Sequence, residues 1–553
     1  MFKAFSSLYS ELVESSPLRR RVFRLFYFGS IGAALGYTIQ ATIAAWLMAT
    51  LTPSTLMVAM VQTASTLPSL LFGLVAGSLA DIVERRKIIL VTQIVLVIAI
   101  AVLGITALAG LIGPVSLLAL TFVVGTGFTF YLPAQQANIN ELVPPDELHR
   151  AVALGAVAFN VARAVGPALA GAIVAWVNSG SAFLVSAACF TAMIFTVRQL
   201  RAHHHALPGV PERLLSGVLS GLRFVRHSPG MRSLVLRNLS FAICASAFWA
   251  LLPVIARDQL GLGAGGFGLL SGAFGLGAIV GALSIPSQLK RRSLNSVVVS
   301  GTLLWTLATL LIAATDLSAV AVAGTFGAGM AWVCVFASLT AGTQSTAPAW
   351  VRARAVATSL VAVQASLAIG SALWGALASA TGIRMALVSS AAMMLVLYGL
   401  SYRIRVALGS EAEVTPGFQL PELAMAIEPM PEDGPVLIQV EYRIDRDQRD
   451  AFLQAIQAVE ATRRRNGAMS WRVFRDLGEE GSFIERFIIA SWAEYVRLRN
   501  RATVADRQAH AALEQFQRAE VPIRVSRLIG VDLDNAGFAP DRLSGSGAGE
   551  ARG

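Results

Sequence analysis

Arg163 is the only lysine or arginine that lies well inside one of the long apolar stretches of this 553-residue sequence. A guanidinium group is always charged and fits the oxygen atoms of carboxylates and phosphates. Because a charge away from water costs about 3 kcal/mol or more, such a residue usually faces a water-filled cavity. We therefore expect Arg163 to face a central cavity near Asn160, where it attracts an anionic group of a ligand or an acid such as Glu141. The structural alternative is an arginine that reaches toward the interface or pairs two helices.

The residues around Arg163 have helical spacing. Asn160, Arg163, Pro167 and Gly171 follow one another at intervals of three, four and four residues, which places them on one face of a helix. Pro167 lacks a backbone N–H and kinks a helix, while Gly166 and Gly171 let a neighbouring helix approach closely. The alternative interpretation is a seam of small residues that serves packing only.

Other polar residues within the apolar stretches are candidates for the wall of the same cavity. They are Tyr37, Gln40, Tyr131, Gln135 and Gln136. Individually, most of them are equally compatible with polar groups that join packed helices.

The elements that must position these residues are predicted to be membrane-spanning helices. Hydrophobic residues make up 55% of the chain and charged residues 14%, against about 25% in ordinary globular proteins. This composition excludes an ordinary soluble protein. A bilayer-spanning helix needs about 20 mostly apolar residues. The sequence holds twelve such stretches, at residues 24–49, 56–79, 88–110, 116–138, 152–176, 181–198, 236–256, 266–287, 295–314, 318–341, 357–379 and 384–402.

The charges are divided unequally along the chain. Residues 1–405 carry a net charge of +16 and residues 406–553 a net charge of −5. Within the apolar part, the connections alternate between arginine-rich ones and ones that hold only Arg257 and Arg384. Cytoplasmic loops carry the excess of Lys and Arg, so we predict an even number of spans in the plasma membrane with both termini in the cytoplasm. The basic charge is thus a topology signal, and nucleic acid is excluded as a partner.

The apolar part contains an internal repeat. Residues 150–175 and 354–379 match at 12 of 26 positions at a constant offset, including Gly166 with Gly370 and Gly171 with Gly375. The fifth stretch therefore repeats as the eleventh, as expected for parallel repeats related by an axis along the membrane normal.

The loop between the second and third stretches carries a motif, GSLADIVERRK. Gly77, Asp81, Arg85, Arg86 and Lys87 match the signature of the major facilitator superfamily of secondary transporters, which the twelve stretches in two halves also resemble. Ile82 and Glu84 depart from that signature. The resemblance implies that Asp81 accepts hydrogen bonds across the interface of the two halves in one conformation only. The alternative is an ordinary basic cytoplasmic loop.

The motif around Gly166 and Pro167 resembles the one associated with export members of that superfamily. Exporters of this kind commonly exchange substrate for protons, yet the acids Asp81, Glu141, Asp258 and Asp316 all lie near the ends of stretches. A coupling proton therefore stays an open expectation. Nothing resembles a phosphate-binding loop, and residues 203–205, three adjacent histidines, cannot converge on one ion. We expect no cofactor, no metal and no catalytic residue.

The C-terminal region predicts a small α+β domain. Alternation from Val436 to Ile444 indicates a strand; an amphipathic helix (445–466), two strands (469–475 and 482–490), a charged helix (491–516) and a last strand (522–529) follow. This order is the ferredoxin-like pattern. With Trp471, Glu485 and Trp492 in their context, it resembles dimeric α/β barrel domains related to antibiotic-biosynthesis monooxygenases.

The whole chain thus resembles the transmembrane secretion effector group, which includes enterobactin-exporter-like proteins. The residues available for monooxygenase chemistry are Asn466, Trp471, Trp492 and His510. Core packing and a turn explain these four residues more simply. We therefore interpret the C-terminal domain as a dimerisation or regulatory module, with a homodimer as the expected partner state.

The expected fold is an all-α bundle of twelve transmembrane helices in two parallel six-helix repeats, followed by the ferredoxin-like domain. The expected function is secondary active export of small organic molecules, siderophores or drugs, by alternating access; the alternative is a membrane-tethered monooxygenase-like enzyme or sensor. The predicted segments are a cytoplasmic N-terminal segment (1–20), a six-helix half (21–198), a basic cytoplasmic loop (199–235), a second six-helix half (236–405), a linker (406–433), the cytoplasmic domain (434–532) and a disordered tail (533–553).

Overall fold

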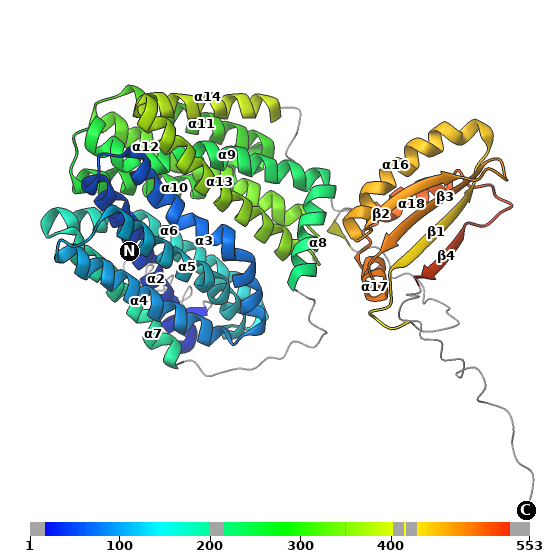
Figure 1. The fold of residues 1–553 in the computed structure, drawn as a ribbon, viewed down its shortest axis with the longest axis horizontal. Helices are drawn as coiled ribbons and strands as arrows, with labels where there is room; N and C mark the ends of the chain where they lie inside the picture. Colours follow the sequence, from blue (N-terminus) through cyan, green and yellow to red (C-terminus); the bar gives the residue numbers. More distant parts are fainter. Residues whose placement is uncertain (1–16, 200–213, 349, 402–413, 416–428, 531–553) are drawn as a thin grey trace, which may run out of the picture. The chain divides into compact units, whose positions relative to one another are not determined.

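The computed structural model describes residues 17–199, 214–348, 350–401, 414–415 and 429–530 (Figure 1). Most of the predicted N-terminal segment, most of the linker, the three histidines at 203–205 and the whole of the predicted tail lie outside these residues. The predicted segment boundaries remain predictions.

Within the described residues, twelve helices are long and apolar enough to cross a membrane. They are α2 (Arg21–Leu51), α3 (Thr55–Ile82), α4 (Arg85–Leu108), α5 (Pro114–Leu142), α6 (Pro145–Trp176), α7 (Ser179–Gln199), α9 (Pro229–Val254), α10 (Ala264–Arg291), α11 (Leu294–Ala314), α12 (Ser318–Thr346), α13 (Arg352–Thr381) and α14 (Ile383–Ser401). Each predicted stretch falls on one helix. Several helices are longer than the predicted stretches. For example, α12 reaches Thr346 instead of residue 341, because a helix continues past the point where its apolar composition ends.

Local sequence signals define the helix starts. Proline, which lacks an N–H that a first turn leaves unpaired anyway, opens α5 at Pro114 and α6 at Pro145. Serine caps two other helices: the Ser54 side chain accepts from the Met57 amide, and the Ser293 side chain accepts from the Ser296 amide.

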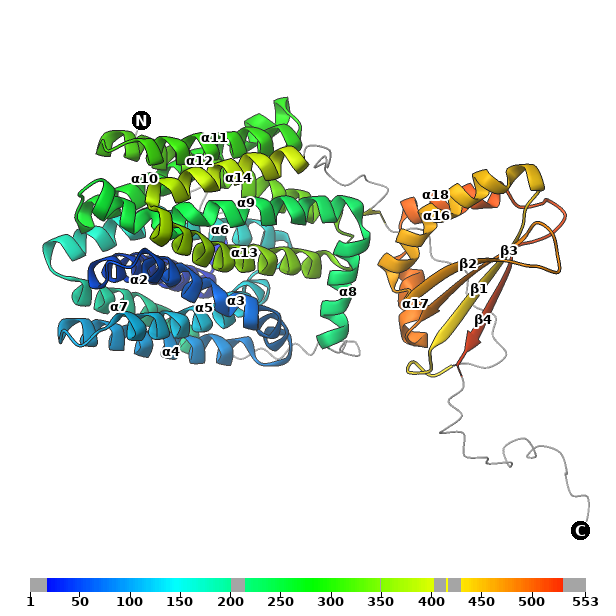
Figure 2. The same cartoon turned by 45° about the horizontal axis from the view of Figure 1, so that its top comes forward.

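The helices form two sets of six, and each set has its own hydrophobic core. Figure 2 shows the blue and cyan helices α2–α5 and α7 on one side of the bundle and the green to yellow helices α9–α12 and α14 on the other. Phe183 and Phe190 are fully buried in the first core, and Trp305 and Phe248 in the second. Many large apolar side chains are exposed on the outside of the bundle, among them Ile105, Leu283, Leu307 and Ile369. Such a surface suits contact with lipid.

The internal repeat has a structural counterpart. Helix α6 of the first half packs on α10 of the second, and the repeated helix α13 packs on α3 of the first. A Cβ atom placed on Gly171 would lie 2.7 Å from the Gly268 Cα, and one on Gly375 would lie 2.4 Å from the Ala59 Cβ. The matching glycines therefore make matching close contacts between the halves.

One helix was not predicted. Residues Leu214–His227 form α8 within the segment interpreted as a basic loop. Leu215, Val218, Leu222 and Val225 recur at intervals of three and four residues, which is the signal of an amphipathic helix.

The chain divides into two compact units. The bundle unit consists of residues 1–218, 232–345 and 353–408, and the C-terminal unit consists of residues 409–553 with the segments 219–231 and 346–352. Inside the C-terminal unit, the Arg223 guanidinium donates to the Gly467 carbonyl at 3.3 Å, and Arg501 lies 4.2 Å from the centre of the Trp350 ring.

The C-terminal unit contains a four-stranded antiparallel sheet in the order β2-β3-β1-β4. Its strands are β1 (Val436–Arg443), β2 (Ser470–Arg475), β3 (Ser482–Ile489) and β4 (Arg524–Ile529), and its helices are α16 (Arg449–Asn466), α17 (Trp492–Arg501) and α18 (Val504–Glu514). The helices cover one face of the sheet (Figure 2), where Val436, Ile438 and Val440 of β1 are buried. The predicted fold class, a twelve-helix bundle with a small C-terminal sheet region, is confirmed.

The prediction of a single charged helix for residues 491–516 is wrong. The chain leaves α17 at Ala502 and starts α18 with a capping box, in which Thr503 and Asp506 each accept from the other's backbone amide. Two helices therefore form, because Thr503 and Asp506 supply a start signal in the middle of the amphipathic pattern.

Candidate functional site

Arg163 lies near the midpoint of α6 and reaches across to the second half of the bundle. Its guanidinium carbon is 5.2 Å from the ring centre of Trp249 on α9, 5.5 Å from Phe274 on α10 and 5.3 Å from Trp332 on α12. We call these three rings the aromatic box. A cation within about 6 Å of a ring face is attracted by the electrons of the ring. The charge of Arg163, which belongs to the first half, therefore lies against aromatic rings of the second half.

The aromatic box is itself a packed cluster. The ring centres of Trp249 and Phe274 are 4.4 Å apart, and those of Trp249 and Trp332 are 5.7 Å apart. Phe274 and Trp332 are buried, whereas Trp249 and Arg163 each keep some accessible surface. The rings are thus packed together, and Arg163 is not fully enclosed.

Among the described residues, no ion pair joins Arg163 to a carboxylate. Glu141, one of its two predicted partners, instead accepts from Arg85 at 2.6 Å. The other predicted partner, an anionic group of a substrate, stays a prediction.

Two buried hydrogen-bond donors, one in the aromatic box and one on α2, have no partner in the described structure. The indole Nε1 of Trp249 and the side-chain Nε2 of Gln40 are buried and donate to no acceptor in the described structure. Tyr37, one turn before Gln40 on α2, is close enough to Arg163 for the two groups to interact electrostatically. Since a buried donor without an acceptor is costly, these groups are suited to an acceptor that is brought in from outside.

The remaining cavity candidates divide into two kinds. Tyr131 is buried, and Gln135 donates to the Ser30 hydroxyl at 3.2 Å, so these residues link α5 to α2 as packing groups. The Tyr37 ring stacks on Phe128 at 3.9 Å. Gln136 is exposed.

The glycines of the predicted helix motif let α6 pack closely on both sides. A Cβ atom on Gly166 would overlap the Thr38 side chain of α2, and Gly171 meets Gly268 of α10. Thr38 also donates to the Ala162 carbonyl at 3.1 Å, while Asn160 donates to the Ala156 carbonyl of its own helix. The glycines therefore make the packing seam that was the alternative interpretation, and they bring Arg163 to the other half.

Pro167 acts on Arg163 through the backbone. Helix α6 continues through Pro167, whose nitrogen carries no hydrogen. The carbonyl of Arg163, four residues earlier, therefore receives no helical hydrogen bond from it.

Several contacts join the halves at the end of the bundle whose connections carry Arg257 and Arg384. The Arg257 guanidinium donates to the Thr52 carbonyl at 3.3 Å, and the rings of Trp46 and Phe267 stack at 5.7 Å. The Gly171 and Gly375 contacts lie between this end and Arg163. The two halves are therefore held together on this side of the aromatic box.

The basic residues of the predicted gating motif make contacts within the first half. Arg85 donates to the carbonyls of Ala80 and Ala137, and Arg86 donates to those of Val197 and Arg198. Cations at the carboxyl ends of helices are favourable, because the last carbonyls lack partners. Lys87 pairs with Glu84 at 3.2 Å. Gly77 and Asp81 lie in the last turns of α3, and the side chain of Asp81 is outside the described part; its contact across the halves stays a prediction.

Two buried charges escaped the sequence reasoning. Glu147 in the first turn of α6 accepts from Arg19 at 2.5 Å and from Arg20 at 3.0 Å. Arg237, which had been counted with the basic loop, is 5% exposed inside α9 and lies 4.9 Å from the Tyr398 ring. The sequence signal for Glu147 is an acid in a first helical turn, and the signal for Arg237 is an arginine at the start of an apolar stretch.

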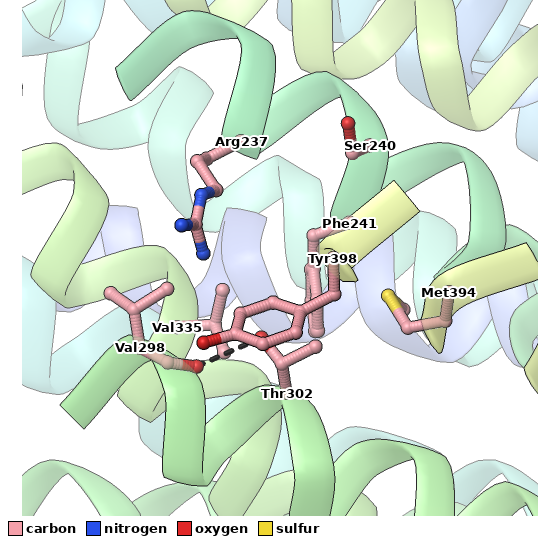
Figure 3. A pocket seen from close by; sticks show the side chains of 8 residues that line it. All are labelled: Arg237, Ser240, Phe241, Val298, Thr302, Val335, Met394 and Tyr398. Carbon is pink, nitrogen blue, oxygen red and sulfur yellow. Dashed lines mark hydrogen bonds between the residues drawn. The ribbon is translucent and has the colours of Figure 1, made fainter. Parts of the chain in front are cut away.

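Figure 3 shows the small pocket beside Arg237 in the second half. Its volume of about 20 Å³ is room for one water molecule. The lining residues are Arg237, Ser240, Phe241, Val298, Thr302, Val335, Met394 and Tyr398. An organic substrate does not fit there.

The C-terminal unit contains a different buried cluster. Glu485 is fully buried and accepts from Arg463 Nε at 2.9 Å, from Trp471 Nε1 at 2.9 Å and from the Tyr442 hydroxyl at 3.2 Å. Burial alone would raise the pKa of the Glu485 carboxyl, but the charge and hydrogen bonds of Arg463 hold that pKa below its ordinary value. Burial lowers the pKa of His510.

The other residues considered for monooxygenase chemistry have structural partners. Asn466 donates to Asp506 at 3.1 Å, and the Trp492 ring packs on Tyr495 at 5.1 Å. Trp471 is engaged with Glu485. These contacts agree with the interpretation of the residues as packing groups.

Twelve apolar helices in two halves, joined by close glycine contacts around one central charge, define a membrane transporter. Residues 13–534 match the family model described as transmembrane secretion effector, and the chain belongs to this family. It is a multi-pass membrane transporter of the major facilitator type.

The curated relatives include transporters of different substrates. The chain is 26% identical over 230 residues to the multidrug efflux pump Tap of Mycolicibacterium fortuitum, covering 40% of this chain and 56% of that protein. It is 22% identical over 268 residues to the staphyloferrin A transporter of Staphylococcus aureus, covering 48% of this chain and 67% of that protein. The match to the efflux pump thus spans little more than half of that relative's length.

Solved structures share the fold. A bacterial homolog of the human lysosomal transporter Spinster, in an inward-facing and unoccupied conformation, superposes with a TM-score of 0.58 at 15% identity, covering 70% of this chain and 98% of that one. The nucleoside transporter NupG, as a D323A mutant, gives a TM-score of 0.58 at 12% identity, covering 69% and 99%. At these identities the likeness concerns the fold.

Proposed function

We propose that this protein is a secondary active exporter of small organic molecules, of the siderophore or drug class, that works by alternating access. The observation that carries the proposal is the paired packing of α6 on α10 and of α13 on α3. Both contacts join the halves and would have to part or slide if the six-helix halves rock about a central site. The similarity to a multidrug efflux pump and to a siderophore transporter supports the substrate class.

The glycine contacts suit a joint that opens and closes. At Gly171 and Gly375 the helices touch through backbone and methyl groups, without long side chains that would have to disengage. Contacts of this kind depend on close packing alone. The stacked pair of Trp46 and Phe267 and the bond from Arg257 to Thr52 would then part when the Arg257 end opens.

The charge pattern supports the proposed orientation. The connections that hold Arg85 with Arg86, and Lys290 with Arg291, lie at the end opposite to Arg257. Under the positive-inside rule that end and both termini face the cytoplasm. The conformation described here would then be closed toward the outside of the plasma membrane.

Accumulation assays test the function. Cells with and without the gene are loaded with a panel of siderophores and drugs at two external pH values, and retained compound is measured over time. The proposal expects lower retention of at least one compound when the protein is present, and a dependence on the pH difference if a proton is exchanged. Equal retention of every compound would contradict transport of this class, and higher retention would show import.

A variant pair ties the result to the packing. Gly171→Leu places a side chain where the Gly268 backbone lies and should abolish export, because the helices of the two halves cannot approach. Gly399→Leu is the matched control, since a Cβ at Gly399 meets no atom within 4 Å. Loss of export in both variants would mean that the substitution acts through insertion or folding.

The C-terminal unit is proposed to pair with a second copy through the uncovered face of its sheet. Phe474 opposes Ile484, and Leu437 lies between Ile488 and Leu528 on that face. Phe474 and Leu528 are exposed, and apolar groups on an uncovered sheet favour association. Light scattering of the full-length protein in detergent should give a dimer that the double variant Phe474→Asp, Leu528→Asp dissociates. Leu477→Asp, in an exposed turn, should leave the dimer intact; a monomeric wild type would refute the proposal.

A further inference from the structure

We propose that Arg163 and the aromatic box form the binding site for a planar organic anion, such as an aryl carboxylate, with the guanidinium pairing to the anionic group and the rings stacking on the planar group. This inference rests on the proposed transport function and names the substrate class that the central site would take.

The charge of the site points to an anion. Within the described residues, Arg163 is balanced by rings and by no carboxylate, so the middle of the bundle carries an uncompensated positive charge. An organic cation that entered would stand beside a like charge in a poorly screened interior, where repulsion is strong. An anion would instead supply the missing countercharge and gain a charge-assisted hydrogen bond.

The unused hydrogen-bonding groups point the same way. Trp249 Nε1 and Gln40 Nε2 are both donors, and both are buried without an acceptor. A carboxylate offers two oxygen atoms that accept only. Together with the guanidinium, the Trp249 donor in the aromatic box suits the acceptor oxygens of an anion.

The rings determine the shape of the ligand. Trp249, Phe274 and Trp332 surround the guanidinium, which is itself planar and stacks on aromatic faces. A flat aromatic ring attached to the anionic group can replace the guanidinium against one of these faces when Arg163 turns toward the carboxylate. Trp249 and Arg163 keep accessible surface, so both can be approached.

The internal repeat shows that a helix at this position does not need a charged residue in order to pack. Leu367 occupies the position in α13 that corresponds to Arg163 in α6, and it is buried among apolar residues. Helices at this position therefore pack between the halves without an arginine. The arginine is present only on the side that faces the aromatic box.

Binding to the purified full-length protein in lipid nanodiscs tests the inference. The probes share one ring system: 4-nitrobenzoate as the anion, 4-nitrobenzamide as its neutral counterpart and (4-nitrobenzyl)trimethylammonium as a cation. Nitroaromatic rings quench tryptophan fluorescence, so binding near the box is followed by titration and checked by calorimetry. We expect saturable binding of 4-nitrobenzoate, about 10- to 100-fold tighter than that of either other probe.

Four substitutions assign the binding to the site. Arg163→Gln should weaken 4-nitrobenzoate binding about 10- to 100-fold, and Arg163→Lys should weaken it less because the charge remains. Arg237→Gln, which alters another buried arginine against an aromatic ring, should change it less than about 2-fold. Trp249→Phe keeps a ring and deletes the Nε1 donor, so it should weaken binding even if the Arg163 variants fail to fold.

The outcomes separate this inference from transport itself. Tighter binding of the cation, or unchanged 4-nitrobenzoate affinity in both Arg163→Gln and Trp249→Phe, overturns the anion site even if cells export a compound. Saturable, Arg163-dependent binding of 4-nitrobenzoate in a protein that exports nothing in cells keeps the site and refutes the proposed function.

Discussion

Two half-buried arginines in this chain are stabilised in different ways. In the C-terminal unit, Arg463 donates to the fully buried Glu485 at 2.9 Å and lies 4.6 Å from the Phe487 ring. In the bundle, Arg163 has three aromatic rings and, among the described residues, no carboxylate. The first pair is neutral as a whole, whereas the second site keeps its positive charge.

We infer from this difference that Arg463 serves the fold and that Arg163 is available to a ligand, as proposed above. A buried charge that serves the fold comes with its countercharge, because one partner alone leaves a large desolvation cost. Cation–π contacts reduce that cost for Arg163 without cancelling the charge. The bundle therefore keeps a charge available, and substitutions at the two sites should have opposite consequences for stability and function.

The largest effect is expected from Glu485→Gln. It leaves Arg463 buried without a countercharge, which should cost about 3–5 kcal/mol of the stability of the C-terminal unit. Hydrogen exchange of the β1 and β3 amides in the full-length protein measures this loss. Unchanged protection would show that the pair contributes nothing and would remove one side of the comparison.

The next largest effect should come from Leu367→Arg, which places a charge in α13 where the repeat has Arg163 in α6. Leu367 is buried in an apolar cluster, so the cost should be about 3 kcal/mol. A lower thermal transition of the purified bundle, relative to the conservative variant Leu367→Met, checks the prediction. If Leu367→Arg is as stable as Leu367→Met, position rather than the rings accommodates the arginine.

Trp471→Phe should have an intermediate effect. It deletes one of the donors to the Glu485 carboxylate while keeping an aromatic side chain, and a hydrogen bond to a charged group contributes about 1.5–3 kcal/mol. The same exchange measurement on β3 reports it. Trp176→Phe, on the exposed surface of α6, is the control that should leave the protection of β3 unchanged.

Acid should destabilise the site of Glu485 and Arg463 but not the site of Arg163. The pKa of Glu485 is lower in the folded unit than in the unfolded chain, so its contribution is present above the unfolded value of about 4.3 and is lost as the pH falls through the folded value. Pepsin sensitivity of the C-terminal unit should therefore rise below about pH 4. The Glu485→Gln variant should lack this component; the same acid sensitivity in that variant would place its origin elsewhere.

The smallest effect on stability is expected from Arg163→Leu, which makes α6 resemble α13. Removing a charge that has no carboxylate partner should change the free energy of unfolding, measured from the thermal transition, by less than about 1 kcal/mol. Export should fall at least about 10-fold. Measuring both properties in the same preparation sharpens the contrast with Glu485→Gln. Loss of stability together with loss of export would make Arg163 a structural residue like Arg463.

Most of the fold was predictable because it depends on local composition and periodicity. The twelve helices follow from apolar stretches of sufficient length, and the strand positions follow from alternation such as that from Val436 to Ile444. The break between α17 and α18 was missed because Thr503 and Asp506 were read as part of one amphipathic pattern. Helix α8 was missed because its arginines were interpreted as loop charges.

The candidate site was predictable only in part. Arg163 was found because a lone charge in an apolar stretch stands out, and Gly166 and Gly171 were found by their spacing. The aromatic box was not found, because Trp249, Phe274 and Trp332 are ordinary residues in three apolar helices. Likewise, nothing in the sequence distinguished Tyr131 and Gln135, which join α5 to α2, from Gln40, which keeps an unused donor.

The sequence by itself determined the number of spans, the repeat, the alternation of charge between connections and the presence of one central arginine. These properties follow from residue type and spacing along a single helix or loop. Only the tertiary structure decided which groups surround Arg163, since its rings come from helices that lie 86 to 169 residues further along the chain. Whether a buried charge is neutralised or left available depends on such distant partners, and it is this choice that separates Arg163 from Arg463.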